Sequence, residues 1–134
     1  TVYYGDEAGM EGFEDPFNRR TFPWGREDSE LMGWFSRLGH LRKQSPALRQ
    51  GDIHYRVGKG PVLAFTRTHG EETVLAVFNT GSEEATLRLR ENEEAQLLLG
   101  SARFHTEPEG PLLTLQPRTG SLLQIVPVPE EEEE

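Results

Sequence analysis

The hydrophobic pattern of this chain changes its period near Gly51. Over residues 29–44, apolar side chains recur every three or four positions, which is the spacing of one helix face. After residue 51 they alternate with polar side chains, as they do along half-buried strands. Because one element cannot satisfy both periods, the pattern predicts two parts with a boundary at residues 50–52.

The first part contains one predicted helix, over residues 29–44. Asp28 or Ser29 can cap its start, and Ser45 ends it because the residue before a proline disfavours helical backbone. The apolar stripe must be buried against something, so a homo-oligomer stays among the open alternatives. The stripe consists of Leu31, Trp34, Phe35, Leu38 and Leu41.

The second part is predicted to be all-β. Short alternating runs separated by turn residues, as at 69–72 and 80–82, are typical of an antiparallel sandwich. We therefore expect a β-sandwich domain over residues 51–127. The predicted strands are 53–56, 62–68, 73–79, 85–90, 95–99, 112–115 and 122–126.

Charge and composition exclude several classes of function. The 134 residues carry 23 acidic and 14 basic side chains, and five of the acids form the run Glu130–Glu134. We expect residues 128–134 to be a disordered acidic tail, because like charges repel one another. The remaining chain has no basic stripe, so a nucleic-acid partner is not expected.

Neither a membrane segment nor a metal or cofactor site is predicted. No apolar run reaches the 18 or more residues that a spanning helix needs, so no membrane partner is expected. The chain has no cysteine, and its four histidines lack metal-ligand spacing. The compartment stays undetermined, with the cytoplasm favoured over secretion.

The residues best suited to bind a ligand lie in the segment before the predicted helix. Residues 1–5 are predicted to be a strand, and residues 6–28 form a long loop rich in glycine, proline and aromatic rings. Asp15 and Arg19 in this loop can each make bidentate hydrogen bonds to vicinal hydroxyls, and nearby rings can cover sugar faces. The alternative is that these two side chains, four positions apart, simply pair with each other.

Four pieces of sequence carry a resemblance to a known family. They are Tyr3-Tyr4-Gly5-Asp6-Glu7-Ala8-Gly9, Asp15-Pro16-Phe17-Asn18-Arg19-Arg20, Phe22-Pro23-Trp24 and Ser45-Pro46-Ala47-Leu48-Arg49. In this order they resemble the α-amylase family of glycoside hydrolases, with the closest likeness to its neopullulanase, cyclomaltodextrinase and amylopullulanase branch. The resemblance covers essentially residues 1–126.

The resemblance implies a mixed fold with two structurally different parts. Residues 1–50 would be the last strand, substrate loop and last helix of a (β/α)8 barrel, and residues 51–127 the C-terminal β-sandwich. The implied activity is retaining cleavage of α-1,4 or α-1,6 glucosidic bonds in starch, pullulan or cyclodextrin. Asp15 and Arg19 would bind one glucose unit of an α-glucan.

The resemblance also implies that this chain holds no catalytic residue. In the family, the nucleophilic Asp, the acid/base Glu and the stabilising Asp come from earlier strands, so we expect the isolated chain to be inactive. Its partners would be the α-glucan and the rest of the barrel. The alternative is a non-catalytic β-sandwich module that binds glucan or mediates assembly.

Overall fold

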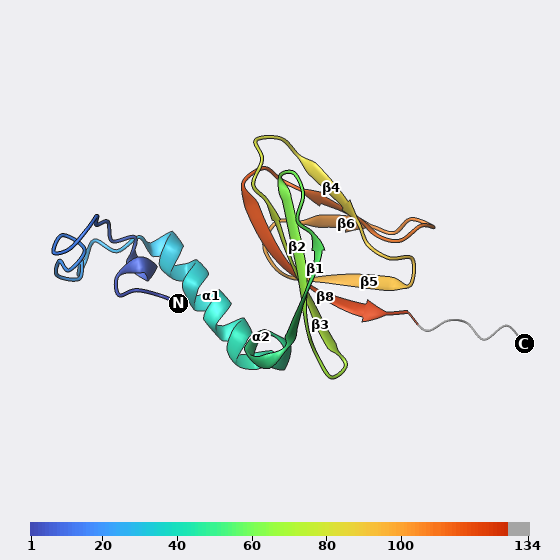
Figure 1. Cartoon of the computed structure of the whole chain (residues 1–134), viewed down its shortest axis with the longest axis horizontal. Helices are drawn as coiled ribbons and strands as arrows, with labels where there is room; N and C mark the ends of the chain where they lie inside the picture. The colour runs from blue at the N-terminus through green and yellow to red at the C-terminus, as the bar shows by residue number, and fades with distance from the viewer. Residues whose placement is uncertain (129–134) are drawn as a thin grey trace, which may run out of the picture. The chain divides into compact units, whose positions relative to one another are not determined.

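The computed structural model of the chain describes residues 1–128 and divides into two compact units (Figure 1). The first unit is Thr1–Gln44, and the second begins at Ser45. Apart from Val128, the predicted acidic tail lies outside the described residues.

The predicted strand at residues 1–5 is wrong. Gly5 has a left-handed φ of 89° and precedes a 3-10 helix, η1 (Asp6–Ala8). Asp6 closes the preceding turn, since its carboxylate accepts a hydrogen bond from the Tyr3 amide at 2.9 Å and its own amide donates to the Tyr3 carbonyl at 3.0 Å. A parallel strand needs neighbouring strands for its backbone hydrogen bonds, and the first unit contains no other strand.

The predicted helix is confirmed as α1 (Ser29–Gln44). Asp28 is its cap: the carboxylate accepts a hydrogen bond from the Leu31 amide at 3.0 Å, and the Asp28 amide donates to the Ala8 carbonyl at 2.9 Å. These two contacts fix the start of the helix against η1. No residue of α1 is buried, so its apolar stripe is at best half covered.

A second, short helix follows directly as α2 (Pro46–Gln50). Pro46 suits the first helical position, where a missing amide proton costs nothing, and the Ser45 hydroxyl accepts from the Leu48 amide at 3.2 Å. Ser45 therefore ends one helix, as the sequence predicts, and caps another that the sequence analysis does not foresee. Ala47 of this turn is fully buried.

The second unit is built from antiparallel β-sheets, and all seven predicted strands are present. A five-stranded sheet has the order β1-β2-β3-β8-β5, and a three-stranded sheet has the order β4-β7-β6. The missed strand is β6, whose three residues are all exposed and so carry no apolar alternation. The strands are β1 (Asp52–Val57), β2 (Val62–His69), β3 (Glu72–Asn79), β4 (Ala85–Arg88), β5 (Glu93–Leu99), β6 (Arg103–His105), β7 (Leu112–Leu115) and β8 (Thr119–Pro127).

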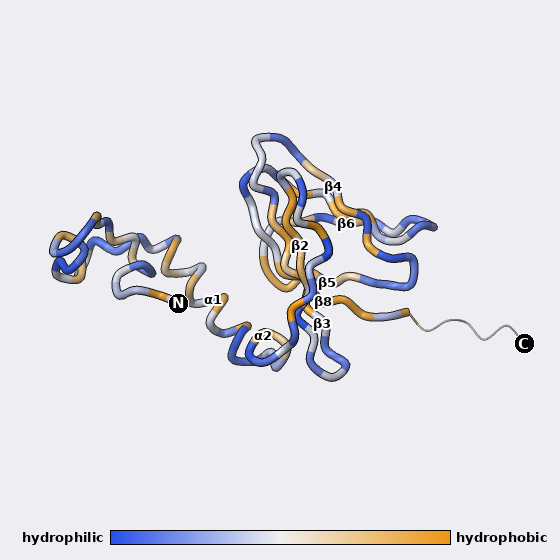
Figure 2. The backbone as a smooth tube through the Cα atoms, viewed as in Figure 1, coloured by the Kyte–Doolittle hydropathy of each residue, from blue (hydrophilic) through white to orange (hydrophobic). Residues whose placement is uncertain are grey.

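The core lies between the two sheets. Alternate residues of β3, β7 and β8 point into it. In Figure 2 much of the strand labelled β8 is coloured as hydrophobic. Leu75 and Leu123 face each other across the β3–β8 ladder, and Leu113 closes the core from the smaller sheet. The buried cluster is Ala64, Leu75, Val77, Leu89, Ala102, Leu113, Leu115, Leu123 and Ile125.

Candidate functional site

The structure brings the two predicted binding residues, Asp15 and Arg19, together. An Arg19 guanidinium nitrogen lies 3.1 Å from an Asp15 carboxylate oxygen, and the two side chains are 61% and 65% exposed. The mutual pairing that the sequence analysis left open is therefore present. An exposed pair of this kind contributes only about 0 to 1 kcal/mol, so a ligand that offers hydroxyl groups can compete for either partner at low cost.

The loop that carries this pair is held by local contacts. The Phe17 amide donates to the Glu14 carbonyl at 2.8 Å, and the Arg19 amide donates to the Pro16 carbonyl at 3.1 Å. A Cβ on Gly12 would lie 2.8 Å from the Asn18 Cα, so only glycine lets these two backbone segments approach. These contacts fold the backbone so that the Asp15 and Arg19 side chains meet.

A small hollow of about 100 Å³ lies beside this turn. Asn18 is one of its lining residues, and its side-chain oxygen is buried without a hydrogen-bond donor among the described residues. Asn18 lies within the motif Asp15-Pro16-Phe17-Asn18-Arg19-Arg20, but no role is predicted for it from the sequence. A buried acceptor that lacks a donor costs free energy, which a bound hydroxyl or water would relieve. The other lining residues are Tyr3, Tyr4, Asp6, Met10, Glu11 and Gly12.

Aromatic rings of the same loop face solvent. Phe13 is 91% exposed and Trp24 is 81% exposed. Trp24 packs against Phe22 with ring centroids 4.7 Å apart, and the Tyr4 hydroxyl donates to the Arg20 carbonyl. These exposed rings are available to cover the apolar face of a ligand.

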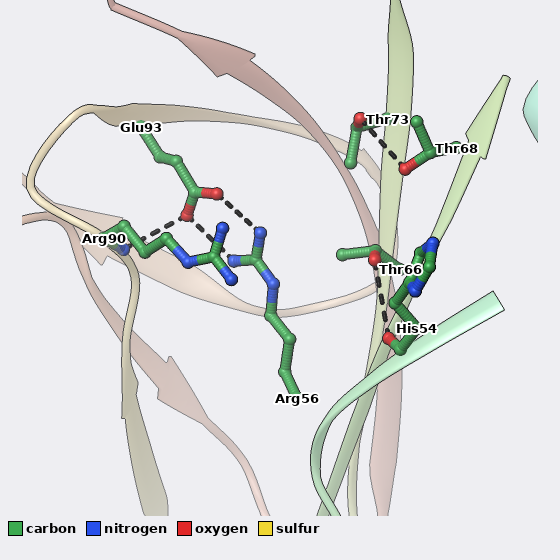
Figure 3. A network of polar contacts seen from close by, with 7 residues as sticks. All are labelled: His54, Arg56, Thr66, Thr68, Thr73, Arg90 and Glu93. Carbon is green, nitrogen blue, oxygen red and sulfur yellow. Dashed lines mark hydrogen bonds and ion pairs between the residues drawn. The ribbon is translucent and has the colours of Figure 1, made fainter. Parts of the chain in front are cut away.

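A second polar cluster lies in the β-sheet unit, centred on Glu93 (Figure 3). Its two carboxylate oxygens accept hydrogen bonds from Arg56 at 2.5 and 2.8 Å, and one also accepts from the Arg90 amide at 3.1 Å. Burial raises the pKa of Glu93, but the hydrogen bonds and positive charges of Arg56 and Arg90 outweigh it, so the pKa lies below its ordinary value. A fully bonded ion pair of this kind indicates a structural role.

The described residues were also considered for a metal site and for a membrane-spanning helix. No group of three or more His, Asp or Glu side chains among residues 1–128 is arranged to hold a metal ion. None of the described helices is long and apolar enough to cross a membrane.

The fold and the loop together define a class: an antiparallel β-domain preceded by a helix and by a loop that presents a carboxylate–guanidinium pair. Residues 57–120 match the family model for the C-terminal domain of maltogenic amylase. A cyclomaltodextrinase of Geobacillus thermopakistaniensis is 34% identical over 87% of this chain, and an amylopullulanase of Thermoanaerobacter thermohydrosulfuricus is 45% identical over 54% of it. The chain spans only 21% and 5%, respectively, of these two relatives.

A solved structure agrees with these relatives. The crystal structure of an Anoxybacillus α-amylase superposes on 96% of this chain with a TM-score of 0.84 and 30% identity, and the chain spans 29% of that protein. This chain belongs to the α-amylase family of glycoside hydrolases and corresponds to the C-terminal part of its members.

Proposed function

We propose that this chain is the C-terminal part of a hydrolase that acts on α-glucans. In its intact form the enzyme would cleave α-1,4 or α-1,6 glucosidic bonds with retention. The proposal is carried by the match of 87% of this chain to the cyclomaltodextrinase. Within it, residues 1–50 are the end of the catalytic barrel, residues 51–127 its β-sandwich domain and residues 128–134 an acidic tail.

Asp15 and Arg19 are the proposed substrate-binding residues. Their charged ends meet at 3.1 Å and are both exposed, so each can form charge-assisted hydrogen bonds to sugar hydroxyls. The neighbouring Asn18 oxygen, which is buried and has no donor within residues 1–128, supplies a further acceptor in the same turn. The chain offers these groups for holding a glucose unit in place.

Hydrolysis itself requires groups that we assign to the rest of the enzyme. A retaining glycosidase needs a nucleophilic carboxylate and an acid/base carboxylic acid about 5 Å apart. In the family these come from earlier barrel strands. The role proposed for residues 1–50 is therefore positioning of the glucan, and the isolated chain is expected to be inactive.

The test uses the intact enzyme. Asp15→Ala and Arg19→Ala should each lower kcat/KM for maltooligosaccharides by about tenfold or more, because each removes a charge-assisted contact worth about 1.5 to 3 kcal/mol. Steady-state kinetics on a series of chain lengths measures this. The loss should be greatest for oligosaccharides long enough to reach the loop.

Arg20→Ala is the matched control, because this arginine follows Arg19 in the same loop and its recorded contact uses only the backbone carbonyl. It should retain kcat/KM within about twofold. Unchanged kinetics for both Asp15→Ala and Arg19→Ala would refute the binding role. Retention of maltooligosaccharide binding by the isolated chain would instead favour an accessory module.

A further inference from the structure

The hollow beside Asn18 is built from three segments of the first unit, residues 3–6, residues 10–12 and Asn18 itself. We call it the loop hollow. Its volume is about 100 Å³. Pockets that enclose an entire small molecule usually measure about 300–1,000 Å³, whereas one water molecule occupies about 30 Å³. The loop hollow therefore suits one side group of a ligand rather than a whole sugar ring.

Hydrogen bonds hold the walls of the loop hollow in place. The Met10 amide donates to the Gly5 carbonyl at 2.9 Å, which closes the backbone around the first wall. The Tyr4 hydroxyl donates to the Arg20 carbonyl, which joins that wall to the loop on the other side. Because these contacts are made without a ligand, a bound group does not have to pay for ordering the walls.

One polar atom of the loop hollow lacks a partner. The Asn18 side-chain oxygen is buried, and no group within residues 1–128 donates a hydrogen bond to it. The Asp6 carboxylate, which also lines the hollow, already accepts a hydrogen bond from the Tyr3 amide at 2.9 Å. A buried acceptor without a donor costs free energy. The loop hollow therefore favours a ligand group that carries a hydroxyl.

A glucose unit inside an α-glucan chain carries free hydroxyls of two kinds. The C2 and C3 hydroxyls are vicinal and lie directly on the ring, whereas the C6 hydroxyl lies at the end of a rotatable CH2 arm. Vicinal hydroxyls suit charged groups that can bond to both at once, and Asp15 and Arg19 offer such groups. The C6 hydroxymethyl arm is the one part of the unit that can enter a hollow of this size while the ring stays outside.

We propose that the loop hollow receives the C6 hydroxymethyl arm of the glucose unit that Asp15 and Arg19 hold. The C6 hydroxyl donates a hydrogen bond to the Asn18 oxygen, and the CH2 group contacts Met10 in the lining. Asn18 and Arg19 are adjacent in the chain, so both can reach one sugar unit. The inference rests on the proposed function and adds that this position selects a glucose unit with a free C6 hydroxyl.

The experiment uses the intact enzyme and two substrates that differ only at C6. One is a maltooligosaccharide, and the other is the same chain built from 6-deoxyglucose. Asn18→Leu replaces the side-chain amide with an apolar group of similar size. It should lower kcat/KM about fivefold or more on the maltooligosaccharide but less than about twofold on the 6-deoxy chain, because only the first substrate loses a hydrogen bond.

Two further variants and a stability measurement serve as controls. Asn18→Asp keeps an acceptor oxygen and should retain the preference for the C6 hydroxyl. Asn92→Leu makes the same change at an exposed asparagine of the second unit and should leave kcat/KM unchanged on both substrates. Asn18→Leu should keep the unfolding midpoint of the intact enzyme within about 1 °C, since an acceptor without a donor does not stabilise the fold.

An equal loss of kcat/KM on both substrates in Asn18→Leu would overturn the inference, because the variant would then act without the C6 hydroxyl. An equal loss accompanied by a lower unfolding midpoint would overturn it as well, by assigning the Asn18 oxygen to a donor from the rest of the enzyme.

The outcomes also separate this inference from the proposed function. If Asp15→Ala and Arg19→Ala lower kcat/KM while Asn18→Leu does not distinguish the two substrates, the proposed function stands and the inference fails. If the intact enzyme hydrolyses no α-glucan, the proposed function fails, and titration calorimetry with the two sugars decides the inference. Tighter binding of the maltooligosaccharide that is lost in Asn18→Leu would support it, and equal binding of both sugars would overturn it.

Discussion

Glu93 forms an ion pair with Arg56 in which both side chains are largely shielded from solvent. It begins β5, and Arg56 lies on β1, so their ion pair joins the two edges of the five-stranded sheet. Five flat strands would hold these edges about 19 Å apart, so the sheet must curve toward itself for the side chains to meet. The two side chains are 9% and 18% exposed, respectively.

Removing the Glu93 charge should destabilise the domain. Glu93→Gln leaves Arg56 half-buried without its carboxylate, which we expect to cost about 2 kcal/mol at pH 7, less than a fully buried pair because Arg56 keeps some contact with water. Urea unfolding followed by circular dichroism measures the loss. Glu94→Gln is the control, because this neighbour is exposed and should change stability by less than about 0.5 kcal/mol.

The Glu93–Arg56 ion pair makes the free energy of unfolding of the domain depend on pH. The pKa of Glu93 is lowered in the folded state, so its stabilising contribution is complete above the ordinary glutamate pKa of about 4.3 and is lost as pH falls through the lower folded value. The stability gap between wild type and Glu93→Gln should therefore narrow between pH 5 and pH 3. A gap that stays constant over this range would contradict the assignment.

At the level of elements, the junction between α2 and β1 depends on a glycine. Gly51 has an ordinary φ of −73°, but a Cβ there would overlap the Ala47 carbonyl oxygen and lie 2.9 Å from the Thr68 carbonyl oxygen. The Gly51 amide also donates to the Ala47 carbonyl at 2.9 Å. Close approach of the backbone, rather than left-handed φ, is the reason for glycine at this position.

Gly51→Ala should cost about 2 kcal/mol of unfolding free energy, because the helix must move off the sheet to make room. The urea midpoint of the 134-residue chain reports this. Gly58→Ala serves as the matched control, since a Cβ at Gly58 meets nothing within 4 Å. Equal urea midpoints for the two variants would show that the junction between α2 and β1 accommodates the added methyl group without strain.

At the level of the whole chain, the two units differ in how much they bury. Residues 1–44 contain only Gly5 and Ala8 as buried positions, whereas the second unit has a continuous core. Local opening is easiest where few apolar side chains are buried. Trypsin should therefore cut residues 1–44, at Arg19, Arg20 and Arg26, well before it cuts Arg56 or Arg67.

Mass spectrometry of the digest identifies the order of cleavage. Leu113→Ala should remove the protection of the second unit, because it opens a cavity at a fully buried position and costs about 3 kcal/mol. Simultaneous cleavage in both units of the wild-type chain would contradict the prediction. The same digest tests whether residues 51–127 behave as a separate domain.

Sequence reasoning succeeded where the signal is local. The helix at 29–44 and the strands were predictable because the spacing of apolar side chains directly records which face is buried. The strand predicted at residues 1–5 was wrong because its apolar and aromatic residues specify a strand only when neighbouring strands are present. Strand β6 was missed because three exposed residues carry no alternation.

The sequence by itself determined the two periods, a helix start at Asp28 or Ser29 and the presence of Asp15 and Arg19 on one loop. Only the tertiary structure decided that Arg19 pairs with Asp15, that Glu93 meets Arg56 across the sheet, and that Tyr55, Phe65 and Phe78 share one face. The physical reason is register. Contacts between residues far apart in sequence depend on strand order and pairing, which the spacing of apolar residues leaves open.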